Sequence, residues 1–315
     1  MLFRSNRFNL NPNVKIIEVA VPYFIGAKEG IDFKRSKDIN QINKFNYNLN
    51  FEAFATAQEW LGKPDLVISD YEPVCAQYGY AYQAKVITID QQSKFFTRNT
   101  IKNLNGFNCE DEIMRLNMFF PLAERLACSF FKVKEAHNVT IFPPIYREKI
   151  KKLKRDIKQG HFIVYISAQP GFEQNIDDLM KIFEQRNETF HVFMKETFVS
   201  THNVISYTHG DCRFEDCLSF CEGVISTAGH NLLSECMFLH IPVYAMPLNL
   251  YEQQLNAYMI GKNNLGINFP VLNSSFLDEF IQNIPLYTKN IIESDVLFKE
   301  SGENLIINKI NEMLK

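Results

Sequence analysis

The chain alternates between two kinds of segment, and this alternation limits its possible folds more than any other feature. Short runs rich in Val and Ile end in small or polar residues, as in LVISD (66–70), VITID (86–90) and GVIST (223–227). Longer amphipathic stretches lie between such runs. Strands that alternate with helices at this pace form parallel sheets with helices on both faces. We therefore predict an α/β protein made of two Rossmann-like, doubly wound domains.

A break near the middle of the chain divides these two domains. The chain has 315 residues, enough for two domains of ordinary size. Pro143 and Pro144 interrupt regular structure before a new strand begins at 161. We predict a first domain over 1–147, a second over 148–315 that includes the C-terminal helices, and a hinge over 144–158. A basic run falls in this hinge, and it fits either a solvated helix face or contact with anionic lipid: Lys149, Lys151, Lys152, Lys154 and Arg155.

The pattern also predicts the individual elements. In the first domain we expect strands at 14–24, 65–70, 85–90 and 129–133, and helices at 45–61, 74–83 and 110–127. In the second domain we expect strands at 161–167, 191–195, 203–208, 223–227 and 242–247, and helices at 174–186, 213–221, 230–239, 252–262, 275–283 and 302–314.

Composition excludes several classes of protein. A net charge of -3 argues against a nucleic-acid-binding surface. No apolar run reaches the ~20 residues that span a bilayer, and the N-terminus lacks the apolar centre of a signal peptide. Seven cysteines, an odd number, also fit the cytoplasm, with peripheral contact at the inner face of the membrane as an option. The spacing of Cys212, Cys217 and Cys221 favours core residues over a metal site.

The segment 223–268 carries the clearest functional signal. A strand runs into Ser226-Thr227-Ala228-Gly229, where small residues let a ligand approach the backbone. A helix follows near His230 and Asn231, and its free N–H groups favour an anion such as a diphosphate.

Polar residues after this loop add to the signal. Glu235 can accept hydrogen bonds from the two vicinal hydroxyls of a ribose, although an acid near a helix start is also common for electrostatic reasons. Glu252 and Gln253 open the next helix and suit recognition of sugar hydroxyls, and Asn256 one turn later can brace their loop. Taken singly, each of these residues also fits an ordinary surface position.

Together, the order Ser-Thr-Ala-Gly-His-Asn, Ser-Glu, Pro-Val, Pro, Glu-Gln and Asn-Ala resembles the donor site of GT-B glycosyltransferases. It is similar to the peptidoglycan GlcNAc-transferase group, and more so to a bacterial and archaeal branch with the pattern STAGHN…SE…P…EQ..NA. The resemblance covers the second domain and, more loosely, residues 64–96.

The resemblance implies a role for each matching residue. Glu235 would bind the ribose, and Glu252 with Gln253 would read the donor sugar. Asp211 or Phe214 would flank the base. The donor would be a nucleotide-sugar, a UDP-sugar in particular, with no metal ion required, since the helix start neutralises the diphosphate. The residues at the diphosphate would be Ser167, Ala228, Gly229, His230 and Asn231.

One part of the family pattern is absent from this sequence. GT-B relatives usually begin with a strand and a Gly-x-Gly-His loop that often carries the catalytic histidine, and we expect the first βα unit to be missing here. The remaining candidates for the proton acceptor are Asp70 and Asp90, at the ends of predicted strands, followed by Glu72. Each also fits turn chemistry. His230 is a further catalytic candidate, as a donor to the leaving group.

These observations predict sugar transfer from a nucleotide-sugar to a hydroxyl acceptor, which by analogy would be a surface glycan or a lipid-linked molecule. Two alternatives stay open at this stage. One is an inactive nucleotide-sugar-binding protein that lacks its first unit, and the other is a nucleotide-sugar 2-epimerase, which shares the fold.

Overall fold

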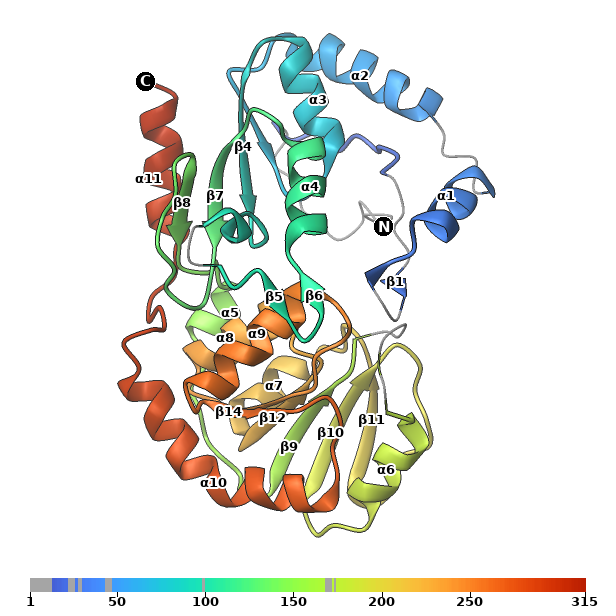
Figure 1. Ribbon diagram of the computed structural model, residues 1–315, viewed down its shortest axis with the longest axis vertical. Coiled ribbons are helices and arrows are strands. Elements are labelled where there is room, and N and C mark those ends of the chain that lie inside the picture. Colours follow the sequence, from blue (N-terminus) through green and yellow to red (C-terminus); the bar gives the residue numbers. More distant parts are fainter. Residues whose placement is uncertain are drawn as a thin grey trace.

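Two parallel β-sheets with flanking helices make up the molecule, and one lies above the other in Figure 1. The computed structural model describes residues 13–21, 26–27, 30–42, 47–97, 100–167, 172 and 174–315. Every strand pair within the two large sheets is parallel. This arrangement confirms the doubly wound α/β architecture that the alternating sequence pattern predicts.

The second-domain sheet has the strand order β11-β10-β9-β12-β13-β14. The order reverses between β9 and β12, so the sheet has a topological switch point there. Ligands of doubly wound sheets bind in the crevice beyond the carboxyl ends of the strands at such a point. The strands are β9 (His161–Tyr165), β10 (Thr189–Met194), β11 (Val204–Thr208), β12 (Gly223–Ser226), β13 (Val243–Ala245) and β14 (Gly266–Asn268).

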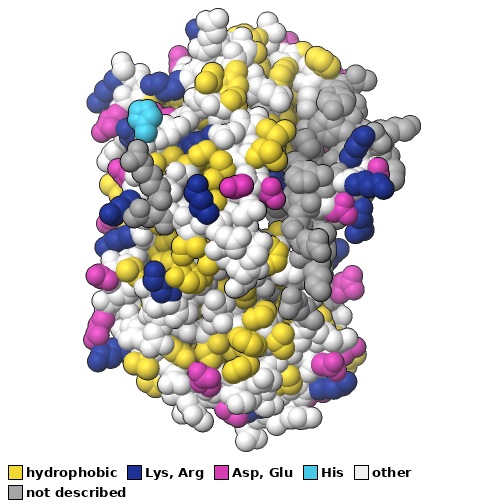
Figure 2. Space-filling view, viewed as in Figure 1, with side chains coloured by type: hydrophobic (Ala, Val, Ile, Leu, Met, Phe, Trp, Pro, Cys, Tyr) yellow, Lys and Arg dark blue, Asp and Glu magenta, His cyan; other side chains and the backbone are white. Residues whose placement is uncertain are grey.

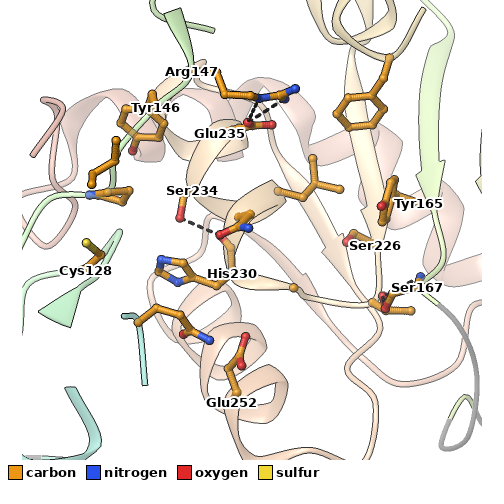
Figure 3. Close-up of a pocket in the computed structure, with 18 of the residues that line it drawn as sticks. Cys128, Tyr146, Arg147, Tyr165, Ser167, Ser226, His230, Ser234, Glu235 and Glu252 are labelled. Atoms are coloured by element: carbon orange, nitrogen blue, oxygen red, sulfur yellow. Dashed lines mark hydrogen bonds and ion pairs between the residues drawn. The ribbon is translucent and has the colours of Figure 1, made fainter. Parts of the chain in front are cut away.

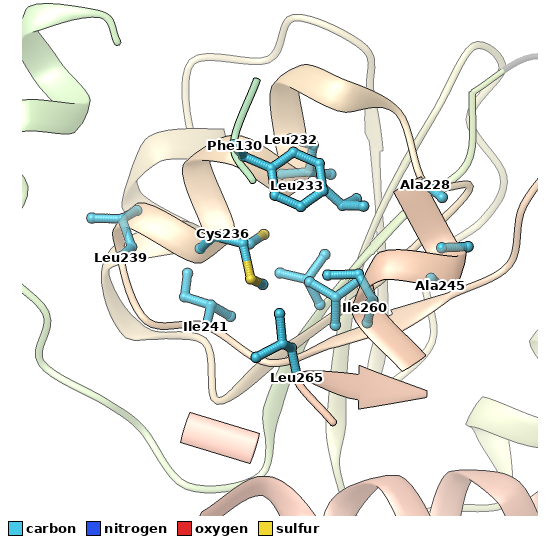
Figure 4. Close-up of a cluster of buried hydrophobic side chains, with 14 of the residues drawn as sticks. Phe130, Ala228, Leu232, Leu233, Cys236, Leu239, Ile241, Ala245, Ile260 and Leu265 are labelled. Atoms are coloured by element: carbon cyan, nitrogen blue, oxygen red, sulfur yellow. The ribbon is translucent and has the colours of Figure 1, made fainter. Parts of the chain in front are cut away.

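Helices cover this sheet and hold the switch point in place. They are α6 (Ile176–Glu184), α7 (Phe214–Phe220), α8 (His230–Phe238), α9 (Tyr251–Lys262) and α10 (Ser274–Glu293). Leu233 and Cys236 of α8 are fully buried in one core cluster with Ile260 of α9 and Leu265 (Figure 4). Phe130, from the other domain, packs into the same cluster. This packing fixes α8, and so it fixes the helix start that faces the switch point.

The first-domain sheet has the order β3-β4-β7-β8, in β3 (Leu66–Ser69), β4 (Lys85–Asp90), β7 (Glu124–Cys128) and β8 (Val139–Phe142). Val67 and Val86 of this sheet share a core with Ala76 of α3 (Pro73–Ala81) and Leu116 of α4 (Glu110–Phe119). The remaining elements are β1 (Gly26–Ala27), β2 (Gly30–Ile31), α1 (Phe33–Ile42), α2 (Tyr47–Leu61), η2 (Ser93–Phe96), β5 (Asn103–Leu104), β6 (Phe107–Asn108) and α5 (Glu148–Lys151).

The last helix, α11 (Glu303–Met313), returns to the first sheet (Figure 1). Its Ile306 is buried with Ile87 of β4 and Phe142 of β8. On the way, Gly302 donates its N–H to the carbonyl of Pro144 at 2.9 Å. The sequence places this helix in the second domain at 148–315, whereas its packing is with the first. The chain therefore crosses between the domains twice.

Several predicted elements of the first domain are wrong in position. Residues 14–21 of the predicted strand 14–24 form no strand, and 22–25 lie outside the described residues. Asn50 of α2 instead bonds both backbone groups of Ala20, at 2.7 and 3.0 Å. The predicted helix 110–127 ends at Phe119, because Pro121 cannot continue it, and the strand begins at Glu124 rather than 129.

Charged side chains of both signs are interspersed over the face in Figure 2, with no extended field of one sign. Within the part of the chain that the structure describes, no helix is both long and apolar enough to cross a membrane.

Candidate active site

A cavity of about 1050 Å³ lies between the two sheets, at the carboxyl ends of the strands of both. Asp70, Asp90 and Cys128 line it from the first sheet, and Ser167 and Ser226 from the second. Figure 3 shows Cys128, Ser167 and Ser226 in the cavity wall. The cavity volume is slightly above the ~300–1000 Å³ typical of small-molecule sites. The cavity therefore has room for a large ligand that contacts both domains.

The loop after β12 presents its backbone to this cavity. Gly229 is the N-cap of α8 and makes no side-chain capping bond. A Cβ added to Gly229 would meet no atom within 4 Å, so neighbouring protein does not require a glycine here. The preceding Ala228 is held at φ 61°, and Asn256 donates from Nδ2 to its carbonyl at 3.1 Å. The sequence predicts that Asn256 braces the loop of Glu252, but it braces this one.

Glu252 belongs to α9, and its carboxylate lies at the start of α8. It accepts a hydrogen bond from Gln92 Nε2 at 3.4 Å, and the nearby amide of Gln91 and backbone N–H of His230 lower its pKa. Burial raises the pKa of Glu252, and a nearby lysine opposes this effect. An acid of the second domain is thus held by two amides of the first.

Gln253 points elsewhere. Its side chain is buried, and its Oε1 accepts the backbone N–H of Leu248 at 2.9 Å. It does not line the cavity in the described structure, whereas Glu252 does. Contact of Gln253 with a donor sugar stays a prediction.

Glu235 lines the cavity from α8 and is paired with an arginine of the linker (Figure 3). Arg147 donates to Glu235 Oε1 from Nη2 at 2.9 Å and from Nε at 3.2 Å, and to Glu215 from Nη1 at 2.6 Å. Burial raises the pKa of Glu235, Arg147 lowers it, and Glu215 raises it. Two acids suited to vicinal hydroxyls therefore share one guanidinium.

An aromatic wall follows on the far side of Glu235. Tyr165 stacks on His209 with ring centroids 4.8 Å apart, and Phe214 meets Tyr165 edge-on at 5.7 Å. Asp211 also lines the cavity, and Arg213 lowers its pKa to about 2. Both predicted base-flanking residues, Asp211 and Phe214, are thus in the cavity wall.

Ser167, at the end of β9, joins the two loops at the switch point. Its hydroxyl lies 2.6 Å from Thr227 Oγ1, and its backbone N–H donates to the same oxygen at 3.2 Å. Hydroxyl and amide groups therefore face the start of α8 from the neighbouring strand. The structure brings Ser167 together with Gly229, His230 and Asn231 in the cavity wall, and Ala228 is buried beside them. A diphosphate site at these residues stays a prediction.

The imidazole of His230 is buried at this site, with 5% of the residue exposed. Neither ring nitrogen has a hydrogen-bond partner among the described residues. Burial, and secondly the charge of Lys94, hold the pKa of His230 well below its usual value. The ring is therefore neutral at physiological pH, and it has one donor and one acceptor nitrogen available for hydrogen bonds.

The three acids of the first domain differ in their surroundings. Asp70 lines the cavity, and its pKa is raised by burial and then by Asp90 and Glu72. Asp90 also lines the cavity, but its carboxylate accepts the backbone N–H of Ser93 at 2.5 Å and the hydroxyl at 2.8 Å. Glu72 caps α3 by accepting the N–H groups of residues 74 and 75. Of these three acids, only Asp70 both lines the cavity and has a carboxylate that accepts no hydrogen bond from the described residues.

Sequence reasoning missed four residues that shape this site: Lys94, Arg147, Tyr165 and Glu215. Arg147 lies just before the basic run that begins at Lys149, and only the folded chain brings it to Glu235. The described residues hold no group of three or more His, Cys, Asp or Glu arranged to bind a metal ion.

Comparisons with known proteins agree with this geometry. Residues 37–285 match the family model described as Glycosyl transferase family 1. A search of curated proteins finds no significant match.

Solved structures share the fold at low sequence identity. A glycotransferase of kitacinnamycin aligns with a TM-score of 0.61 at 11% identity, over 90% of this chain and 84% of that chain. UGT2 of Phytolacca americana, complexed with UDP-2fluoro-glucose and pterostilbene, aligns with a TM-score of 0.58 at 10% identity, over 87% and 80%. The spinosyn forosaminyltransferase aligns at 0.54 and 12% identity, over 92% and 86%. The common architecture is the GT-B fold.

Proposed function

This chain belongs to glycosyl transferase family 1, and on that premise we propose that it transfers a sugar from a UDP-sugar to a hydroxyl group of an acceptor. The observation that carries the proposal is the start of α8, where the N-cap residue Gly229 supplies no side-chain cap and which opens into a cavity shared by both domains. Backbone N–H groups and the positive end of a helix bind a diphosphate and stabilise the charge that it gains as it leaves.

The donor occupies the second-domain side in this proposal. Ser167 and residues 228–231 hold the diphosphate, Glu235 accepts the ribose hydroxyls, and Tyr165 and Phe214 flank the base. Glu252 reads the sugar, with Gln253 behind it. Because the helix start supplies the neutralising groups, no metal ion is needed.

Chemistry requires a proton acceptor for the hydroxyl, and Asp70 is the best placed. A pKa raised by burial and by two neighbouring acids brings a carboxyl group closer to the range in which general bases work. Asp90 is the second candidate, although its bonds to Ser93 occupy both carboxylate oxygens. His230, neutral and unpartnered among the described residues, donates a hydrogen bond to the leaving diphosphate.

The acceptor in this proposal is a surface glycan or a lipid-linked molecule. The enzyme would work in the cytoplasm, with peripheral contact at the inner face of the membrane, and the peptidoglycan GlcNAc-transferase group would be the nearest functional model. Neither the family match nor the similar structures support a 2-epimerase or an inactive binding protein.

Two measurements test the proposal. Titration calorimetry with UDP and a panel of UDP-sugars should detect binding, and Glu235→Gln should weaken all of them, since every ligand in the panel carries the ribose. Asp70→Asn should retain donor affinity and lose turnover. Unchanged UDP affinity in Glu235→Gln would overturn the donor assignment.

A further inference from the structure

Lys94 is a buried cation at the junction of the two domains. It lies on η2, directly after the strand that ends at Asp90, and only 1% of it is exposed. Its ammonium group lies 5.5 Å from the ring centroids of both Phe95 and Phe131. A lysine is almost never fully buried unless it is paired, so its polar contacts need an explanation.

Those contacts lead to the donor site through one amide. Lys94 Nζ donates to Gln91 Oε1 at 2.8 Å. Gln91 in turn lies beside the carboxylate of Glu252, and its amide and the backbone N–H of His230 both lower the pKa of that carboxylate. A continuous chain of polar contacts therefore runs from the buried lysine, across the domain boundary, to the start of α8.

Lys94 sets the orientation of the Gln91 amide. An ammonium group can only donate, so it binds the oxygen of the Gln91 amide and turns the NH₂ group the other way. The NH₂ group then faces Glu252, and a carboxylate can only accept. With a neutral partner in place of Lys94, the amide could reverse and present its oxygen to the carboxylate.

We propose that Lys94 is a positioning residue of the donor site, which acts through Gln91 to hold Glu252 in the orientation that receives the donor sugar. The inference rests on the proposed function, since it assigns Glu252 to the sugar and not to the nucleotide. It also explains why a cation is buried in the first domain at its boundary with the second.

The proton of Lys94 makes this device sensitive to pH. Burial lowers the pKa of Lys94 to about 8, while Glu252, Asp90 and Cys128 oppose the effect. His230 of α8 faces the same ammonium group but stays neutral. Because the ordinary lysine value is 10.5, the folded protein loses this proton in a range where exposed lysines keep theirs. Above pH 8 the amide is no longer held in one orientation.

The test compares ligands with and without a sugar. UDP, UDP-glucose and UDP-GlcNAc are titrated by calorimetry against the full chain and against Lys94→Met and Lys94→Arg at pH 7 and pH 9. Lys94→Met should weaken the UDP-sugar that binds best about tenfold and leave UDP within twofold. Lys94→Arg should restore most of the affinity, because a guanidinium also only donates.

The pH series separates positioning from packing. The wild type should lose UDP-sugar affinity from pH 7 to pH 9 with UDP unchanged, whereas Lys94→Arg should stay flat across this range. Gln91→Leu should match Lys94→Met, and the double variant should be no worse than either. Lys102→Met, an exposed lysine of the same region, is the control and should change nothing.

Each negative result has a distinct meaning. If wild-type protein binds no UDP at all, the proposed function fails. If UDP and UDP-sugars bind and both weaken equally in Lys94→Met, or the pH profile is the same in Lys94→Arg, the role of Lys94 is wrong. Melting temperatures of the variants show that folding is intact, and Gln91→Leu supplies the same test if Lys94→Met does not fold.

Discussion

Replacement of Gly229 by alanine tests whether this glycine is required for stability or for ligand binding. The backbone at Gly229 has φ -65° and ψ 137°, a conformation open to every residue, and the added Cβ meets no atom within 4 Å. Loss of a glycine N-cap costs up to ~1 kcal/mol. Alanine also lowers the conformational entropy of the unfolded chain, which stabilises the folded protein by ~0.4–1 kcal/mol. We therefore expect the free energy of unfolding to change by less than ~1 kcal/mol.

Binding should respond differently, because the methyl group enters the space beside the free N–H groups of α8. Loss of one hydrogen bond to a charged group costs ~1.5–3 kcal/mol, which corresponds to roughly 10- to 150-fold in Kd. Calorimetric titration with UDP measures this loss, and thermal unfolding without ligand measures the stability.

Gly62 provides the opposite control. It follows α2 at φ 62°, and a Cβ there also meets no atom within 4 Å. Gly62→Ala should cost ~1–2 kcal/mol of stability through backbone strain and leave UDP affinity unchanged. If Gly229→Ala binds UDP as tightly as the wild type, or destabilises the protein as much as Gly62→Ala, the diphosphate assignment of this loop is refuted.

Three further predictions follow from the described contacts. Gly302→Ala should destabilise the protein by more than ~2 kcal/mol in urea unfolding, because its Cβ would lie 2.1 Å from the carbonyl oxygen of Pro143; a normal midpoint would contradict that packing. Stability should fall as pH drops from 6.5 towards 4. Burial lowers the pKa of His191 to about 4, so the unfolded chain takes up the proton first, and His191→Phe should make the urea midpoint less dependent on pH over this window. Arg147→Ala should free Glu235 to bind the ligand, so UDP should bind more tightly than to the wild type, with folding and expression unchanged. Equal Kd values for UDP in both proteins would show that the ion pair does not compete with the ribose.

The second domain was predictable because its signals are local. Each buried strand is a short run of apolar residues, and the switch-point loop carries its small residues in consecutive positions, 226–229. The sequence therefore predicts β9, β12, α8 and α9 and gathers Ser167, Gly229 and Glu235 at one end of a sheet. The first domain was less predictable where a proline sets the end of a helix, as Pro121 does between α4 and β7.

The partners of the site residues were not predictable, because they are distant in sequence. Arg147 meets Glu235 across 88 positions, and Gln92 meets Glu252 across 160. Periodicity and spacing report only on neighbours within an element, so such pairs leave no trace in one sequence. For the same reason the sequence does not predict the burial of Lys94, because that burial depends on Phe131 and on the second domain.

The return of α11 to the first sheet has a consequence for the order of folding during synthesis. Ile87, Leu126 and Phe142 leave the ribosome long before Ile306, which covers them. Chains generally fold domain by domain as they emerge. Here the first sheet must wait with one face open while the second domain forms, and it becomes complete only when the last helix is released. A nascent chain that pauses before 303 would expose this apolar face to chaperones.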